Sequence, residues 1–192
     1  ARKIVEVIQL CWEWADESDR WEGFIPRPRR LKLTRKKQGF AKAPTWGQLD
    51  ACVDALNGWQ KDVAVVLRYT GVRVSEAMNL LWSDIDFDGG RLRLRPEVSK
   101  VDLEYFIPLS PHLMSEIAGW GRREGFLIRS GRCVGPRHRQ VRARDFSRAW
   151  KRAEIPQEVW KGQPTHAFRK GFKSNLLADG AHPDGVDFLQ GH

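Results

Sequence analysis

Residues 70–86 read T-G-V-R-V-S-E-A-M-N-L-L-W-S-D-I-D, a stretch that turns the chain at a glycine and starts a helix at an arginine. Gly71 permits a tight turn, and Arg73 follows at the start of the helix. An arginine in that place can grip a phosphate, because the backbone amides and the helix dipole favour the same anion. Glu76, one turn on, can hold the guanidinium. An Arg–Glu pair three residues apart is more often an ordinary helix surface pair, so the motif alone is only suggestive.

The sequence on both sides of this stretch predicts a mainly helical domain. Before it, the spacing of apolar residues predicts a helix over residues 45–56, with Thr45 as N-cap, and a second helix over residues 61–69. After it, we expect Ser75 to cap a third helix that runs to Leu81. Further helices are predicted to begin near Pro111, Ala143 and Thr165.

A small antiparallel sheet interrupts these helices. The turn D-G-G at residues 88–90 leads into residues 91–95, whose strict alternation of apolar and charged side chains predicts a half-buried strand. A second strand over residues 103–107 runs back, and the connection between the two carries Lys100. We therefore predict an α+β fold, mainly helical with a small three-stranded antiparallel sheet.

A second candidate motif, T-H-A-F-R-K at residues 165–170, opens a helix near the end of the sequence. His166 and Arg169 are three residues apart beside an apolar stripe that includes Phe168, so both can point into a groove and contact one substrate group. The last four residues, L-Q-G-H, place His192 after a glycine turn. Taken singly, each histidine is more often structural than functional.

The charge of the chain is concentrated in two segments. The net charge is +9, from 33 Lys and Arg residues against 24 Asp and Glu residues. Residues 20–42 hold nine basic side chains and one acid, and residues 122–152 hold eleven basic side chains and two acids. Dense positive charge interleaved with aromatic residues suits a polyanion such as nucleic acid, although a single cluster would more often be a solvated face.

The ordered set Arg73, Lys100, His166, Arg169 and His192 predicts a chemistry. The histidines lack the H-E-x-x-H pattern, the cysteines lack C-x-x-C spacing, and there is no phosphate-cradling glycine loop, so we expect neither a metal site nor a cofactor. Two arginines, two histidines and a lysine instead suit phosphoryl transfer without a metal ion. Arginines neutralise nonbridging oxygens, histidines relay protons, and a lysine protonates a leaving oxygen.

From about Thr45 onward the sequence resembles the tyrosine recombinases, or phage-type integrases. The resemblance rests on residues 70–86, the hairpin lysine, and the motifs F-I-P-L-S, H-A-F-R-K-G-F and L-Q-G-H. It implies two parts. Residues 1–42 would be the last helix of a core-binding domain with its basic linker, and residues 43–192 would be the catalytic domain.

The resemblance also implies roles for single residues. Arg73 and Arg169 would bind the scissile phosphate, and Lys100 would be the general acid for the 5′-hydroxyl leaving group. His166 would relay a proton, His192 would hydrogen-bond a nonbridging oxygen, and Glu76 would support the site from behind. The residues expected to contact double-stranded DNA are Arg27, Arg29, Arg30, Lys32, Arg35, Lys36, Lys37, Arg137, Arg139, Arg142 and Arg144.

The sequence departs from the family at the nucleophile. The family carries a tyrosine shortly after the Gly-His motif, whereas the tyrosines here are Tyr69 and Tyr105, which we interpret as core or sheet residues. We therefore expect both ends to have been removed from a site-specific recombinase that integrates or excises a mobile element. The alternatives are a noncatalytic DNA-binding relative and a type IB topoisomerase.

The expected setting follows from the same resemblance. No apolar run approaches the roughly 18 residues of a membrane span, so a cytoplasmic protein that binds no membrane is the default. The intact protein would assemble as a tetramer on DNA, whereas this chain, without the segment that joins neighbours, would be monomeric.

Overall fold

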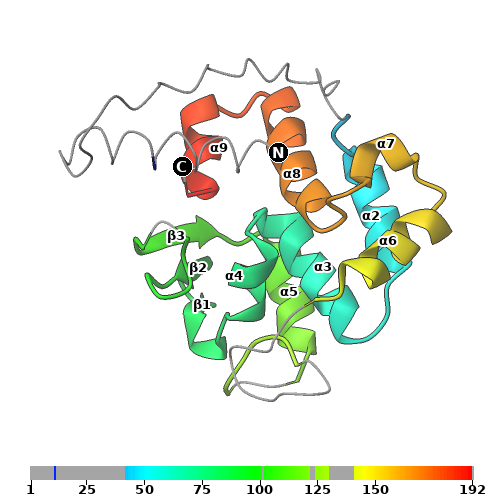
Figure 1. Ribbon diagram of the computed structural model, residues 1–192. Helices are drawn as coiled ribbons and strands as arrows, with labels where there is room; N and C mark the ends of the chain where they lie inside the picture. The colour runs from blue at the N-terminus through cyan, green and yellow to red at the C-terminus, as the bar shows by residue number, and fades with distance from the viewer. Residues whose placement is uncertain (1–10, 12–41, 101, 122–123, 130–140, 192) are drawn as a thin grey trace, which may run out of the picture. The chain divides into compact units, whose positions relative to one another are not determined.

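The computed structural model describes residues 11, 42–100, 102–121, 124–129 and 141–191 (Figure 1). The chain divides into two units, residues 1–40 and 41–192, and the second is described below. The helix and linker predicted for residues 1–42 fall almost wholly outside the described residues. In the described ranges, no helix has the length and apolar character that crossing a bilayer requires.

The second unit is mainly helical and carries one small sheet, as predicted (Figure 1). Its elements, in chain order, are α2 (Trp46–Asp54), α3 (Trp59–Thr70), α4 (Val74–Met78), η1 (Trp82–Asp84), β1 (Ile85–Asp86), β2 (Arg91–Leu94), β3 (Tyr105–Pro108), α5 (Pro111–Gly119), α6 (Ala143–Arg152), α7 (Gln157–Trp160), α8 (His166–Ala178) and α9 (Pro183–Leu189).

Local sequence signals set the first two helices of this unit. Thr45 caps α2 with a capping box, in which its hydroxyl accepts from the Gln48 N–H at 3.3 Å and its own N–H donates to the Gln48 side chain at 3.0 Å. Helix α3 ends at Gly71, whose φ of +64° is left-handed and whose N–H donates to the Leu67 carbonyl oxygen at 3.0 Å. A Cβ at Gly71 would lie 2.3 Å from the Phe172 ring of α8, so only glycine fits.

Helix α4 differs from the prediction at both ends. Its N-cap is Arg73 rather than Ser75, because the Arg73 N–H is taken by the Glu76 carboxylate at 2.7 Å. The helix ends at Met78 instead of continuing to Leu81. The Leu81 backbone is engaged elsewhere, since its N–H donates to the Asp84 carboxylate at 2.8 Å and the residue pairs with Phe126 as a β-bridge.

The sheet has the order β1-β2-β3 with antiparallel neighbours. Residues Leu92 and Leu94 of β2 face the core opposite Ile107 and Tyr105 of β3, and all four are buried. Strand β3 starts two residues later than predicted, after Asp102 at a φ of +53° and a Leu103 side chain that is 65% exposed.

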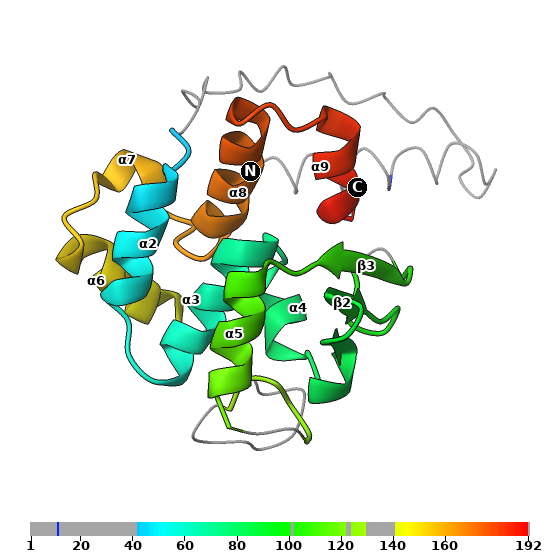
Figure 2. The ribbon, with the colours of Figure 1, turned by 180° about the vertical axis from the view of Figure 1, so that it is seen from behind.

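Aromatic packing joins the C-terminal helices to the rest of the unit. Phe168 of α8 meets Phe146 and Trp150 of α6, with ring centroids 5.9 Å and 5.3 Å away, and all three side chains are fully buried. Helix α8 packs on α3 and α2, and α9 packs beside α8 (Figure 1). Helix α5 packs on α3 and is best seen from behind (Figure 2). The end of α3, the start of α4 and the first half of α8 thereby meet.

Candidate active site

Arg73 and Glu76 form a partly buried ion pair at the start of α4. The Arg73 guanidinium donates to Glu76 at 2.9 Å, in addition to the backbone contact already described. The Glu76 side chain is 1% exposed, whereas that of Arg73 is 21% exposed. The interpretation as an ordinary surface pair is therefore wrong, because the carboxylate is buried. Removing the partner of a buried carboxylate costs far more free energy than removing the partner of a solvated one. Part of the Arg73 side chain therefore reaches the surface.

Lys100 is brought to the same carboxylate by the connection between β2 and β3. Its backbone N–H lies 3.5 Å from a Glu76 carboxylate oxygen, at the long limit of a hydrogen bond. The Lys100 residue is exposed, so its ammonium group is available to a ligand at the surface. Glu76 thus sits behind both an arginine and the loop that carries the lysine.

Arg169 lies on the first turn of α8 and is 4% exposed. Its guanidinium donates to the Gly71 carbonyl oxygen at 3.0 Å and also to the carbonyl oxygen of Gln190. The Gln190 side-chain amide donates back to the Arg169 carbonyl oxygen at 3.0 Å. This arginine is therefore more deeply buried than its helical position suggested, and it joins the ends of α3 and α9.

The electrostatics place His166 with the two arginines. Burial lowers the pKa of His166, and the positive charges of Arg169, Arg73 and Lys170 lower it further. Burial and the Arg73 charge also lower the pKa of Arg169, which Glu76 opposes. His166 and Arg169 share the first turn of α8, and Arg169 donates to Gly71, two residues before Arg73, so the three residues belong to one neighbourhood. At pH 7 the imidazole is neutral and able to accept a proton.

Tyr105 is electrostatically coupled to the same residues, a relationship that the sequence did not predict. Its hydroxyl is buried, and no described residue is its hydrogen-bond partner. Burial raises the pKa of Tyr105 to about 12; the Glu76 charge also raises it, whereas Arg169 and Arg73 act in the opposite direction. The only sequence signal was the alternation of β3, which places this residue on the inward face. The interpretation of Tyr105 as a sheet residue is confirmed, whereas its electrostatic coupling to the site was not predicted from the sequence.

Only some of the remaining predicted site residues lie in the part of the chain that the structure describes. Arg142 and Arg144 are exposed at the start of α6. His192 and the other predicted DNA contacts lie outside the described residues, namely Arg27, Arg29, Arg30, Lys32, Arg35, Lys36, Lys37, Arg137 and Arg139. No group of three His, Cys, Asp or Glu side chains within the described ranges is placed to hold a metal ion.

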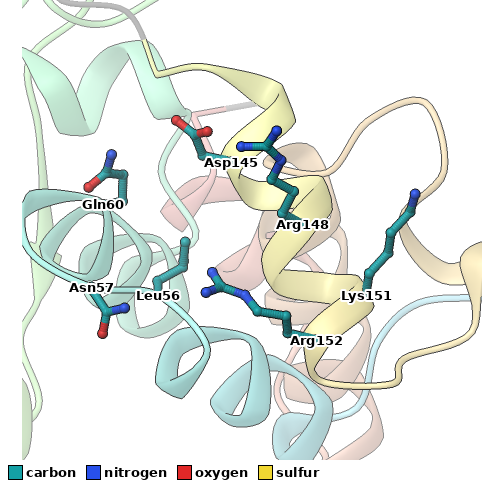
Figure 3. Close-up of a pocket in the computed structure, with 7 residues that line it drawn as sticks. All are labelled: Leu56, Asn57, Gln60, Asp145, Arg148, Lys151 and Arg152. Atoms are coloured by element: carbon teal, nitrogen blue, oxygen red, sulfur yellow. The ribbon is translucent and has the colours of Figure 1, made fainter.

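A separate cavity of about 500 Å³ lies between α6 and the connection from α2 to α3 (Figure 3). It shares no residue with the Arg73 neighbourhood and is lined by Leu56, Asn57, Gln60, Asp145, Arg148, Lys151 and Arg152. The guanidinium of Arg152 points toward Leu56 and Asn57, whereas Lys151 points away (Figure 3). These cations continue the basic character of α6 beyond Arg144. The cavity offers charge but no nucleophile paired with a base.

Chemically, the Arg73 neighbourhood is suited to an anion. Two guanidinium groups held in place by buried acceptors can bind oxygens that carry negative charge, and a neutral imidazole and an exposed ammonium group can move protons beside them.

The sequence matches the phage integrase family over residues 47–192. Among curated proteins, it is 28% identical over 130 residues to the tyrosine recombinase XerC of Xanthomonas axonopodis pv. citri, covering 64% of this chain and 39% of the relative. It is 26% identical over 161 residues to the prophage integrase IntF of Escherichia coli, covering 71% and 33%. The chain thus spans about two fifths or less of the length of these relatives.

Solved structures share the fold. The integrase of the Tn1549 transposon, in complex with a circular intermediate DNA, aligns with 100% of this chain and 70% of its own at a TM-score of 0.72 and 18% identity. The XerA recombinase aligns with 98% of this chain and 65% of its own at a TM-score of 0.64 and 18% identity.

Proposed function

The chain belongs to the phage integrase family, and on that premise we propose that it carries the phosphate-binding and proton-transfer residues of a site-specific tyrosine recombinase. The observation that carries the proposal is the convergence of Arg73 and Arg169, from α4 and α8, beside His166. The substrate is a phosphodiester of double-stranded DNA, the DNA of a mobile element that is integrated or excised.

The geometry suggests how these residues divide the reaction. The two arginines neutralise the nonbridging oxygens of the scissile phosphate and stabilise the charge that develops on them. Glu76 orients Arg73, while the carbonyl oxygens of Gly71 and Gln190 orient Arg169. Because these acceptors are in place before substrate arrives, little reorganisation is needed in the transition state. His192 would complete the anion contacts.

Proton transfer completes the step. A tyrosine hydroxyl attacks phosphorus and passes its proton toward His166, while the bond from phosphorus to the 5′-oxygen breaks and Lys100 protonates that oxygen. The products are a 3′-phosphotyrosine and a free 5′-hydroxyl. Attack by a 5′-hydroxyl from a partner duplex reverses the step and exchanges the strands, so the energy of the phosphodiester is retained.

Neither tyrosine of this sequence suits the role of nucleophile. Tyr69 is half-buried on α3 and packs against His112, with ring centroids 5.2 Å apart. Tyr105 has a buried hydroxyl whose pKa is raised to about 12. We therefore propose that residues outside this sequence supply the nucleophile. We also propose that recombination takes place in a tetramer on DNA in the bacterial or host cytoplasm.

Basic residues outside the site would hold the duplex. Arg142 and Arg144 are exposed at the start of α6, and the same helix continues through Arg148 and Arg152 to the cavity of Figure 3. Contacts of this kind with phosphates position the protein on DNA without reading its sequence. The basic residues predicted between positions 27 and 37 would add to them.

The decisive experiment is covalent trapping. The full-length protein that contains this chain is incubated with nicked duplexes tiled across the DNA that flanks its coding sequence. A recombinase forms a protein–DNA adduct that survives denaturation and is destroyed by protease, and it transfers the strand to a second duplex. Binding without an adduct on any duplex would favour the noncatalytic alternative. Resealing of the original strand alone would favour the topoisomerase.

A further inference from the structure

Tyr105 carries a buried polar group that the described residues leave without a hydrogen-bond partner. The side chain is 6% exposed, and no described residue accepts from or donates to its hydroxyl. Buried hydroxyl groups almost always have partners, and exceptions are concentrated where a ligand or a rearrangement supplies one. The ring itself is packed against Phe188 of α9, with centroids 6.4 Å apart, so the hydroxyl has a fixed place.

That place is under the turn that follows α9. Gly191 has a φ of +64°, and a Cβ there would lie 3.0 Å from the Tyr105 hydroxyl oxygen. The backbone at Gly191 therefore passes close to the hydroxyl. Because Gln190 is also bonded to Arg169, the tyrosine supports the same turn that the arginine holds.

The hydroxyl is also within electrostatic range of the Arg73–Glu76 pair. The charges of Glu76, Arg169 and Arg73 all act on it. Glu76 is buried and relies on donors from Arg73 and from the Lys100 backbone. A phosphate that attracts the Arg73 guanidinium weakens one of these hydrogen bonds. A buried carboxylate then needs a replacement donor, and the buried Tyr105 hydroxyl, which has no partner among the described residues, is a neutral group able to donate.

We propose that Tyr105 is a positioning residue of the phosphate site, whose hydroxyl lies under the turn at Gly191 and donates to the Glu76 carboxylate when phosphate engages Arg73. No bond is formed or broken in this role, and no proton is transferred. The inference rests on the proposed function, because it assigns to Tyr105 a part in positioning the side chains that act on the scissile phosphate. The raised pKa keeps the hydroxyl protonated at neutral pH, as a donor must be.

The test compares the chain's two tyrosines in the full-length protein. Tyr105→Phe removes only the hydroxyl, and Tyr69→Phe makes the same chemical change on α3, where the ring faces His112. We measure the single-turnover rate of adduct formation on a nicked duplex, the dissociation constant for that duplex, and the melting temperature. Partners behind metal ligands typically contribute about 10- to 100-fold, and we expect a loss of that order for Tyr105→Phe.

The other readouts separate positioning from a merely structural role. Tyr105→Phe should bind DNA as the wild type does and should melt at the same or a higher temperature, because it removes an unsatisfied buried group. The rate should fall by the same factor from pH 6 to pH 9, since Tyr105 exchanges no proton. Tyr69→Phe should match the wild type in every measurement.

Three results would overturn the role of Tyr105. The first is a wild-type rate for Tyr105→Phe, the second is a loss of rate that parallels a loss of stability, and the third is an equal effect of Tyr69→Phe. A wild-type protein that forms no adduct overturns the proposed function instead, and the role of Tyr105 with it.

Discussion

Arg169 and Gln190 form two reciprocal hydrogen bonds. The Arg169 guanidinium donates to the Gln190 carbonyl oxygen, and the Gln190 side-chain amide donates to the Arg169 carbonyl oxygen at 3.0 Å. Gln190 is 3% exposed, so neither hydrogen bond competes with bulk water. A second donor on Arg169 reaches the Gly71 carbonyl oxygen. One side chain thereby fixes the end of α9 against the end of α3, where Arg73 begins α4.

Gln190→Ala should therefore loosen the end of α9. The substitution removes a buried hydrogen bond to the Arg169 carbonyl oxygen, and such a hydrogen bond contributes about 0.5–1.5 kcal/mol. We expect the free energy of unfolding to fall by that amount in chemical denaturation. Gln157→Ala, at an exposed position of α7, is the matched control and should change stability little. Equal stability of the two variants would show that the reciprocal contact adds nothing.

Arg169→Lys should separate catalysis from binding in the full-length protein. A lysine keeps the charge but cannot donate to two carbonyl oxygens and a phosphate at once. Loss of such a donor costs about 10²- to 10³-fold in rate, so adduct formation should nearly vanish while DNA binding persists. The control is Arg68→Lys, which makes the same change on α3 at an arginine that is paired with Asp50 of α2. Binding that falls as steeply as cleavage would contradict this division.

The sequence and the structure agree most closely where the signals are local. Thr45 caps α2 because its partner is three residues away, and the alternation of residues 91–94 suffices to predict β2. The start of α4 was misplaced because Ser75 is a good cap in isolation, whereas the buried Glu76 carboxylate, a tertiary feature, gives that position to Arg73. The depth of Arg169 and the orphan hydroxyl of Tyr105 depend on the turn after α9, which no local pattern encodes.

The pKa of His166 should report the neighbouring cations. Burial lowers it below 6.5, and the charges of Arg169 and Arg73 lower it further. Arg73→Gln should therefore raise it in an NMR titration. Lys61→Gln should not, because Lys61, near the start of α3 and paired with Asp54, is not among the charges that act on His166. A phosphate bound between the arginines should raise it as well. An unchanged value in Arg73→Gln would place the imidazole away from that guanidinium.

The lowered pKa of His166 makes the stability of the folded protein depend on pH. The unfolded chain takes up a proton on His166 near pH 6.5, while the folded protein does so only at lower pH. In that window the unfolded state binds more protons, so the contribution of this group is present above pH 6.5 and is lost as the pH falls through the native pKa. His166→Asn should reduce the acid loss of stability in denaturation curves measured from pH 7 to pH 5.

Gly71→Ala should destabilise the unit through two separate terms. A left-handed conformation costs a non-glycine residue about 1–2 kcal/mol, and the new Cβ would lie 2.3 Å from the Phe172 ring. Overpacking adds about 1–3 kcal/mol. Gly47→Ala in α2 is the contrasting control, because nothing lies within 4 Å of its Cβ position, and it should stabilise slightly. In a Phe172→Leu background, Gly71→Ala should lose less stability, because the clash with the ring is relieved. The cost of the left-handed backbone conformation should remain.

The salt dependence of DNA binding should locate the duplex relative to α6. Each lost phosphate contact lowers the slope of log K against log salt by about 0.9, so Arg148→Ala with Arg152→Ala should lower it by about 2. Lys42→Ala with Lys61→Ala removes the same charge from cations that are paired with Glu158 and Asp54. Fluorescence anisotropy with a short duplex between 50 and 300 mM salt measures both slopes. A larger change of slope in the lysine double variant would show that α6 is not part of the DNA-binding surface. A change of slope confined to the arginine double variant would show that this surface extends from Arg144 to the cavity of Figure 3.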